Sequence, residues 1–238
     1  PEIDILYGLR ALSAEQTADG ATVIAEREDG STQSFTGRFV VGADGARSVI
    51  RKAIGANFDG ITHPEVYLTL STKFPYEDHV PGLEKIAYIS DPDEWLVLLR
   101  TPSLWRVLFP TDPSISDEVM LNPQKVEARL QAVVPWSGNY EIEHKTAYRV
   151  FERVCDRYFN GRLIVAGDAA HLNNPLGGMG MNGGIHDAIN LADKLVQIWK
   201  GADIALLGRY ERQRRKVAVE TVQAQSLRNR QIMNTRDP

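Results

Sequence analysis

The fold is decided by one stretch of the chain, Gly167-Asp-Ala-Ala-His-Leu-Asn-Asn-Pro-Leu-Gly-Gly-Met-Gly-Met-Asn-Gly-Gly-Ile-His-Asp187. It follows Arg162-Leu-Ile-Val-Ala-Gly167, a short apolar run that predicts a buried strand, and a helix is expected after it through about Trp199. This order of strand, glycine-rich loop and helix is typical of an open α/β sheet, where ligands bind at the carboxyl ends of the strands. Asp168 lies at such an end. We therefore expect a ligand site here.

The composition of the loop indicates which kind of ligand it binds. The carboxylate of Asp168 can accept hydrogen bonds from a sugar-like hydroxyl chain. The helix is expected to begin near Met181 and Asn182, so that free N–H groups and the positive end of the helix dipole point into the same space. Such an end suits a delocalised negative charge, and the N1–C2=O edge of a reduced flavin is one candidate. Glycines that allow close approach and positive φ precede the helix, namely Gly177, Gly178 and Gly180.

A second stretch repeats the pattern of strand, turn and helix: Val41-Gly-Ala-Asp44-Gly45-Ala-Arg47-Ser48-Val-Ile-Arg51. Its helix is expected to continue through about Ile54. Ser48 and Arg51 project near the helix start, where hydroxyl and cationic groups could meet a diphosphate. An Asp-Gly turn before a helix is, by itself, more often structural than functional.

The regions before and between these stretches are expected to be rich in strands. Residues 3–43 are predicted as β structure, with Asp29-Gly30 as a hairpin turn. Residues 61–111 predict a separate antiparallel sheet, followed by a helix from Asn122-Pro123 to about Val134. A long polar helix is expected from about Leu206 to Met233. The individual strands are expected at Ile3–Tyr7, Ala21–Glu28, Ser34–Val41, Val66–Phe74, Ile86–Ser90, Trp95–Thr101, Trp105–Pro110 and Tyr140–Val150.

Several other interpretations of short patterns are rejected. Gly178-Met-Gly180-Met-Asn-Gly183 spells the dinucleotide fingerprint G-x-G-x-x-G, but it stands about ten residues after its strand rather than directly behind it. No G-x-S-x-G elbow of a serine hydrolase occurs. His171 is expected to be structural, because the histidines lack metal-binding spacing. The basic run Tyr210–Lys216 is interpreted as a solvated helix face.

Composition narrows the class of protein. The 238 residues carry a formal net charge of −4, which gives no indication of binding to nucleic acid or to an anionic membrane. The single cysteine, Cys155, rules out an internal disulfide framework and suits a reducing cytoplasm. No apolar run approaches the roughly 20 residues that span a bilayer. The chain begins with proline and a strand-like segment, as expected of a piece cut from a longer protein.

The two motifs together resemble those of the class A flavoprotein aromatic hydroxylases, a family of the 4-hydroxybenzoate hydroxylase and 3-(3-hydroxyphenyl)propionate hydroxylase type. Gly167–Asp187 is similar to the family's Gly-Asp motif, and Val41–Arg51 is similar to its Asp-Gly motif. The resemblance implies a three-layer α/β domain of the FAD/NAD(P)-binding type, incomplete because the first βαβ unit is missing, with an inserted antiparallel-sheet substrate domain. The FAD-binding parts would be residues 1–60 and 151–238, and the substrate domain residues 61–150.

The resemblance also implies roles for single residues. Asp168 would hold the ribityl chain, and Pro175 would lie beside the reactive edge of the flavin. The amides of Met181 and Asn182 would contact the pyrimidine carbonyl. The diphosphate end of FAD would be contacted by Asp44, Gly45 and Arg47. Four glycines would form the part of the loop backbone that binds the cofactor: Gly167, Gly177, Gly178 and Gly180. Two residues depart from the pattern: Asn174 replaces a frequent proline, and Asp193 a frequent tryptophan.

The implied activity is that of an oxidoreductase. FAD would be reduced by NAD(P)H, O2 would form a flavin C4a-hydroperoxide, and an aromatic or similar ring would be hydroxylated without a catalytic nucleophile from this chain. A homodimer is compatible with the resemblance. Two alternatives stay open: another enzyme on the same fold (a halogenase, an epoxidase or a reductase), or an inactive fragment that does not retain FAD alone. The lysine and tryptophan signature of a halogenase is not seen.

Overall fold

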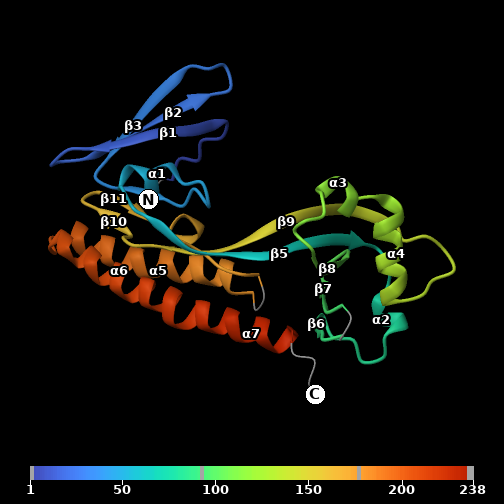
Figure 1. The fold of residues 1–238 in the computed structure, drawn as a ribbon. Helices are drawn as coiled ribbons and strands as arrows, with labels where there is room; N and C mark the ends of the chain where they lie inside the picture. The colour runs from blue at the N-terminus through green and yellow to red at the C-terminus, as the bar shows by residue number, and fades with distance from the viewer. Residues whose placement is uncertain (1–2, 92–93, 176–177, 235–238) are drawn as a thin grey trace. The chain divides into compact units, whose positions relative to one another are not determined.

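The computed structural model describes residues 3–91, 94–175 and 178–234. The chain divides into two compact units (Figure 1). Unit 1 comprises Pro1–Ile61 and Phe151–Leu227, and unit 2 comprises Thr62–Val150 and Arg228–Pro238. Unit 1 holds both motifs. No helix among the described residues is long and apolar enough to cross a membrane.

The first sheet of unit 1 is an antiparallel meander of β1 (Leu9–Gln16), β2 (Ala21–Arg27) and β3 (Thr32–Gly37). The predicted Asp29-Gly30 hairpin is confirmed: Gly30 has a φ of 81°, and the Asp29 carboxylate accepts the Ser31 amide at 2.9 Å. The predicted strand at Ile3–Tyr7 is wrong, because these residues form no ladder and their apolar side chains are exposed. The strand lies at Leu9–Gln16, which pairs with β2 along its length.

The second sheet of unit 1 has the order β10-β11-β4 and contains both motif strands. β10 is Phe159–Asn160, β11 is Leu163–Val165 and β4 is Val40–Gly42. β11 and β4 are parallel, with Val165 opposite Gly42. Because parallel strands end at the same edge of a sheet, the turns that follow them lie side by side. This pairing brings the two motifs together.

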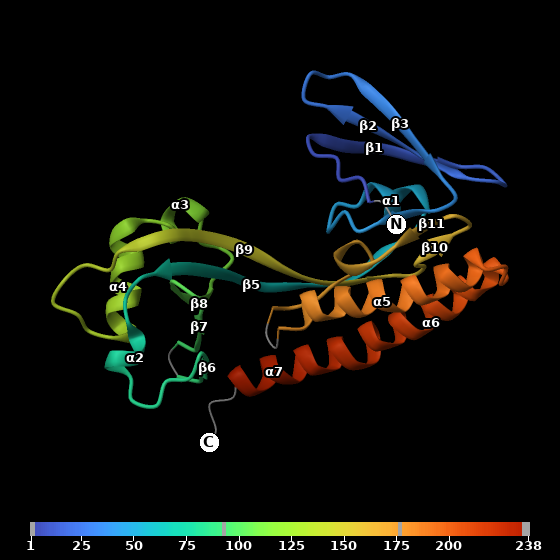
Figure 2. The ribbon, with the colours of Figure 1, turned by 180° about the vertical axis from the view of Figure 1, so that it is seen from behind.

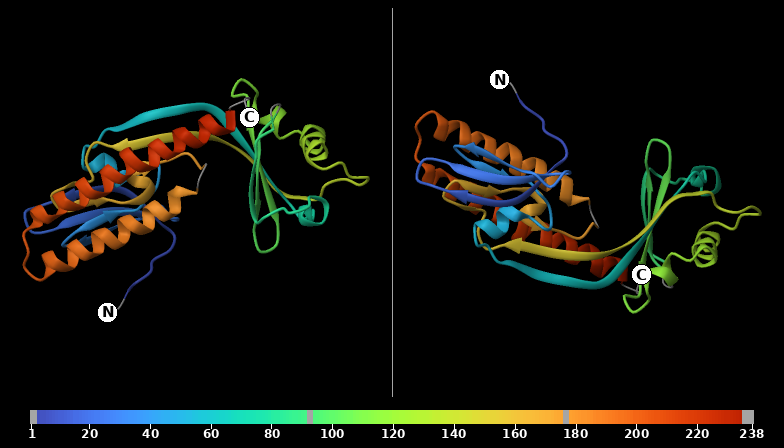
Figure 3. Two further views of the ribbon diagram at one scale, coloured as in Figure 1. Left: turned by 90° about the horizontal axis from the view of Figure 1, so that it is seen from below. Right: turned by 90° about the horizontal axis from the view of Figure 1, so that it is seen from above.

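Helices complete unit 1. The short helix α1 (Val49–Ala53) follows β4, and the turn of 3-10 helix η1 (Gly167–Ala169) follows β11. α5 (Met179–Trp199) and α6 (Leu207–Lys216) lie side by side (Figures 1 and 3). The predicted long helix at the end of the chain consists of three segments: α6, the π-helical η3 (Val217–Gln223) and α7 (Ala224–Asn234). The 3-10 turn η2 (Ile204–Leu206) precedes them.

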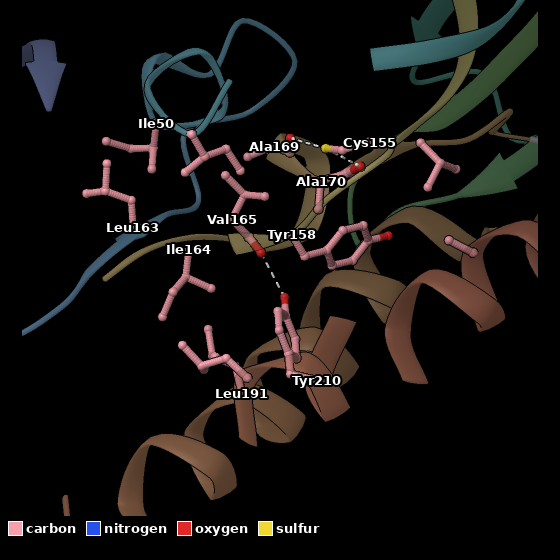
Figure 4. Close-up of a cluster of buried hydrophobic side chains, with 14 of the residues drawn as sticks. Ile50, Cys155, Tyr158, Leu163, Ile164, Val165, Ala169, Ala170, Leu191 and Tyr210 are labelled. Atoms are coloured by element: carbon pink, nitrogen blue, oxygen red, sulfur yellow. Dashed lines mark hydrogen bonds between the residues drawn. The ribbon is translucent and has the colours of Figure 1, made fainter. Parts of the chain in front are cut away.

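The core of unit 1 packs the motif strand between helices (Figure 4). Ile164 and Val165 of β11 are fully buried and contact side chains of α1, α5 and α6. Tyr210 of α6 is also buried, and its hydroxyl donates to the Val165 carbonyl at 2.8 Å. The strand that leads into Asp168 is thus held from several sides.

Unit 2 is an antiparallel sheet covered by short helices, visible together in Figure 2. Five strands contribute to it in the order β9-β5-β8-β7-β6. Their bounds are β5 (Phe58–Thr72), β6 (Ile86–Ile89), β7 (Leu96–Arg100), β8 (Trp105–Thr111) and β9 (Ile142–Cys155). The helices are α2 (Tyr76–His79), α3 (Asp117–Met120) and α4 (Pro123–Val133). Within unit 1, the end of β9 pairs with β12 (His171–Leu172).

The helix of unit 2 that sequence predicted is confirmed as α4. The Asn122 side chain caps it by accepting the amides of Gln124 and Lys125, and proline stands at its first position. Val126 and Leu130 of this helix are fully buried against the sheet. Asn122 therefore begins the helix, and its apolar stripe holds it in place.

Candidate cofactor-binding site

A concavity of about 640 Å³ lies where the two motifs meet in unit 1. Its walls come from the end of β4, the Asp-Gly turn, the Gly-Asp turn and one face of α5. The lining residues are Val41, Ala43, Gly45, Ala166, Gly167, Asp168, Met181, Gly184, Ile185, Ala188, Leu191, Ala192 and Leu195. Asp168 is the one charged residue in this lining, and its side chain is exposed. A mostly apolar wall with one carboxylate suits a flat aromatic ligand that carries a hydroxyl chain.

Two glycines form the closest part of the wall. Gly167 has a φ of 60°, a left-handed conformation that favours glycine. A Cβ built on Gly167 would lie 3.6 Å from the Cα of Gly184 on α5, so the turn and the helix are in near contact. Side chains at these positions would extend into the space between the turn and the helix. Their absence allows the turn and the helix to pack this closely.

The start of α5 supplies hydrogen-bond donors. The helix begins after Gly178, which has a φ of 65° and has no side chain that could cap the first turn. The first amides of an α-helix have no partner within the helix, and the dipole makes this end electropositive. Met181, in this first turn, lines the pocket. The amides, the glycines and the carboxylate together fit the ring and ribityl portion of FAD.

The structure brings together four of the predicted site residues in the pocket wall: Gly45, Gly167, Asp168 and Met181. Asn182 is in the same helical turn, and its side-chain amide donates to the Gly178 carbonyl at 3.1 Å. The carbonyl of Pro175 accepts the Gly178 amide at 3.0 Å. Gly180 lies in the first turn of α5, and Gly177 lies outside the described residues.

The predicted diphosphate residues have mixed surroundings. Asp44 supports the start of α1: its carboxylate accepts the Ser48 hydroxyl at 2.5 Å and the Val49 amide at 2.6 Å. Arg47 is exposed at the turn. Ser48 is fully buried and caps the Arg51 amide at 2.8 Å. Asp44 therefore has a structural role in this turn, and its contact with the diphosphate, like that of Arg47, stays a prediction.

Arg51 differs from its expected position. It does not project freely from the helix start, because its guanidinium is buried and bonded to protein carbonyls. Nη1 donates to Ala169 at 2.9 Å, and Nη2 donates to Ala46 at 2.6 Å. The guanidinium carbon also lies 3.9 Å from the centre of the Phe58 ring. Arg51 ties the two motif turns together.

Sequence reasoning missed a buried ionic cluster behind the turn. Asp187 of α5 is fully buried and contacts His171 and Arg214. Nε2 of His171 lies 2.8 Å from the Asp187 carboxylate, and the structural role expected for His171 stays a prediction. The expectation of a solvated face for the basic run Tyr210–Lys216 is wrong for Arg214. Its side chain is 11% exposed, because it pairs with a buried carboxylate, whereas Tyr210 is buried as one of the apolar positions of the helix.

One signal in the sequence could have revealed this cluster. The buried residues of α5 recur at helical spacing, and they are Gly183, Asp187, Leu191, Lys194 and Ile198. An acidic residue on an otherwise buried stripe needs a partner, since burying an unpaired carboxylate is costly. The partner, Arg214, lies 27 residues further on, and the sequence does not indicate which of the basic residues of α6 fills that role.

The comparisons with known proteins agree with this geometry. Residues 1–225 match the model of the FAD binding domain family. The chain belongs to this family. The FAD expected from the two motifs is the ligand for which the family is named, and the resemblance to flavoprotein aromatic hydroxylases is confirmed.

Individual members of the family show the range of the likeness. Para-nitrophenol 4-monooxygenase from Pseudomonas sp. (strain WBC-3) is 34% identical over 242 residues, covering 100% of this chain and 59% of that protein. A 3-(3-hydroxy-phenyl)propionate/3-hydroxycinnamic acid hydroxylase from Mycobacterium sp. (strain JLS) is 33% identical, covering 99% of this chain and 40% of that protein. The chain thus spans about half the length of these relatives.

A solved structure of the family extends the likeness to the fold. The crystal structure of p-nitrophenol 4-monooxygenase PnpA from Pseudomonas putida DLL-E4 superposes with a TM-score of 0.87 at 32% identity. The match covers 97% of this chain and 58% of that protein. The chain therefore has an FAD-binding monooxygenase fold, with both the α/β part and the antiparallel sheet included.

Proposed function

We propose that the protein containing this chain is an FAD-dependent monooxygenase that uses NAD(P)H and O2 to hydroxylate an aromatic or similar ring. One observation carries the proposal: the 640 Å³ pocket that joins both motif turns to the start of α5. Its apolar wall suits the flavin ring, and its single carboxylate suits the ribityl hydroxyls. The relatives named above act on phenolic rings according to their names, which supports an aromatic substrate here.

The pocket supports specific roles for its residues. Asp168 would accept hydrogen bonds from the ribityl chain, and the first-turn amides near Met181 and Asn182 would contact the pyrimidine carbonyl. The uncapped helix end would favour negative charge on that edge of the ring. Pro175 would lie at the reactive edge. Because no side chain of this set is a nucleophile, the contribution of the chain is positioning, electrostatic stabilisation and exclusion of water.

The proposal extends to the domain organisation. Residues 1–60 and 151–238 would form part of an FAD-binding domain, and residues 61–150 the substrate domain. The ADP half of the cofactor would be held by a βαβ unit outside this chain. The greater length of the relatives supports this arrangement, since the chain spans 59% of the first one. When bound, FAD would supply the redox chemistry and the activation of O2.

The test uses the full-length protein. It is reduced with NADH or NADPH without oxygen while flavin absorbance is followed, and it is then mixed with ¹⁸O2 and a panel of phenols. We expect one ¹⁸O atom in a hydroxylated product, detected by mass spectrometry. Reoxidation that yields only hydrogen peroxide with every ring in the panel would contradict the proposal. Chloride in the buffer distinguishes a halogenase, since that enzyme would yield a chlorinated product.

A variant tests the assignment of the pocket. Asp168→Ala should raise the dissociation constant of FAD by about tenfold or more, because hydrogen bonds between a carboxylate and hydroxyls are charge-assisted. Asp193→Asn, at a side chain on α5 that is 62% exposed and outside the pocket lining, is the matched control and should leave FAD binding unchanged. Equal affinity in the unsubstituted protein and the Asp168 variant would contradict the assignment.

A further inference from the structure

The carboxylate of Asp187 joins three elements of unit 1. Its Oδ2 accepts the backbone amide of Gly167 at 2.9 Å and lies 2.8 Å from Nε2 of His171. Its Oδ1 accepts Nε of Arg214 at 2.5 Å. One buried side chain of α5 thus holds the turn after β11, the strand β12 and the helix α6.

The surroundings of Asp187 favour its carboxylate form. Burial raises the pKa of Asp187, but the hydrogen bonds from His171, Arg214 and the Gly167 amide, together with electrostatic attraction to His171, outweigh it and leave the pKa below its ordinary value. Arg214 also donates to the Gly183 carbonyl at 3.3 Å. Removing one of these donors is costly, because the buried carboxylate then loses part of the hydrogen bonding that compensates for its burial.

The cluster lies directly behind the pocket and outside its wall. Asp187, His171 and Arg214 are absent from the pocket lining, whereas Gly167 and Gly184 belong to it. Asp187 is three residues after Gly184 in α5, and residues three apart share one face of a helix. The same face of α5 therefore contacts the Gly167 turn through Gly184 and accepts a hydrogen bond from it through Asp187. This double contact sets the separation between Asp168 and the amides at the start of α5.

Helix α6 supports the cluster through neighbouring side chains on one face. The Tyr210 hydroxyl donates to the Val165 carbonyl at 2.8 Å, two residues before Gly167. The Glu211 carboxylate accepts the Tyr158 amide at 2.7 Å. Arg214, one turn further, completes the row by contacting Asp187. α6 therefore holds the strand before the turn and the residue that anchors the turn.

We propose that Asp187 is a positioning residue of the cofactor pocket and that, through Arg214, helix α6 determines how tightly the Gly167–Asp168 turn holds FAD. This inference rests on the proposed function, because it takes FAD as the ligand of the pocket. It predicts an effect on affinity beyond the effect on stability. A buried ion pair that served the fold alone would change only the free energy of unfolding.

The experiment compares variants of the full-length protein. Asp187→Asn keeps the shape of the side chain but faces the donors with an amide, and Arg214→Met keeps length without charge. Each should raise the dissociation constant of FAD by about tenfold, the size of effect seen when a residue that orients a binding group is lost. Arg214→Lys keeps the charge and should raise the dissociation constant of FAD less than Arg214→Met does. The measurement is flavin fluorescence titration of the apoprotein.

Two further measurements separate positioning from stability. Ile198→Ala, in the buried stripe of α5 eleven residues beyond Asp187, lowers stability by opening a cavity but should leave FAD affinity within about twofold. In the apoprotein, hydrogen exchange of the Gly167 amide should accelerate in Asp187→Asn, while that of Val165 stays slow. This second readout requires neither FAD nor activity.

The outcomes are distinct. Unchanged FAD affinity in Asp187→Asn and Arg214→Met, despite lower stability, would overturn the inference and leave the proposed function intact. A loss of affinity in Ile198→Ala as large as that in Arg214→Met would also overturn it. If Asp187→Asn does not fold, the test is whether Arg214→Met raises the dissociation constant of FAD more than Arg214→Lys does. Equal dissociation constants in these two variants would then overturn the inference. Absence of FAD binding by the unsubstituted protein would reject the proposed function and this inference together.

Discussion

The guanidinium of Arg51 donates a 2.9 Å hydrogen bond to the carbonyl of Ala169, a residue 118 positions further along the chain. The same guanidinium donates to Ala46 at 2.6 Å, so one side chain joins the turn after β4 to the turn after β11. These are the two turns that form the wall of the pocket. A cation that bridges them serves the geometry of the site without entering it, since Arg51 is absent from the pocket lining.

Arg51→Met should lower the free energy of unfolding by about 2–4 kcal/mol. The substitution keeps the aliphatic stem but leaves two carbonyls without their charged donor, and each such loss costs about 1–3 kcal/mol. Urea unfolding followed by circular dichroism measures the change. The control is Arg47→Met, at an exposed residue of the same turn, which should change stability by less than about 0.5 kcal/mol. Equal stabilities of the two variants would contradict the prediction.

Gly42→Ala should destabilise the end of β4. A Cβ at this position would lie 2.4 Å from Cβ of Ile50 and 2.9 Å from Oδ1 of Asp44, distances that require the backbone or α1 to move. Overpacking of this kind costs about 1–3 kcal/mol. Gly37→Ala, where the built Cβ meets only the Phe39 carbonyl oxygen at 3.4 Å, separates this clash from the general effect of losing a glycine. Neither Gly42 nor Gly37 has a positive φ, so left-handed strain enters neither variant.

The thiol of Cys155 should not react in the native protein at pH 8. Burial raises its pKa to about 12, and the nearby charge of Arg51 lowers it only in part. The thiol also donates to the Ala170 carbonyl at 3.0 Å (Figure 4). Because the thiolate is the reactive form, alkylation should be negligible. Iodoacetamide labelling with peptide mass spectrometry checks this, and urea provides the positive control. Rapid labelling without urea would contradict the burial.

The stability contribution of Asp187 should be lost in acid. Its folded pKa is lowered, so its contribution is fully present above its unfolded value of about 4 and decreases as pH falls through the folded pKa. The difference in unfolding free energy between the unsubstituted protein and Asp187→Asn should therefore be constant from pH 5 to 7 and shrink below about pH 4. Urea titrations at several pH values measure it. A difference in unfolding free energy that grows as the pH falls would contradict the prediction.

The failures of sequence-based prediction have physical causes. Leu9–Gln16 contains residues with poor strand propensity, yet it pairs with β2 along its length, whereas the apolar Ile3–Tyr7 has no partner strand. The ladder rather than intrinsic propensity determined that strand. Arg214 was predicted to lie on a solvated helix face because local composition does not reveal a buried carboxylate in another helix. Both errors concern partners that lie elsewhere in the chain.

The sequence by itself determined the two turns of the site. The positive φ of Gly178, the strand before each turn and the presence of a helix after each turn follow from local residue types, because glycine, apolar runs and helical periodicity act over a few residues. Only the tertiary structure decided which side chains hold the turns together. The parallel pairing of Val165 with Gly42 and the bonds of Arg51 and Asp187 join residues far apart in the chain. Such contacts depend on the folded geometry of several elements at once, which no local pattern specifies.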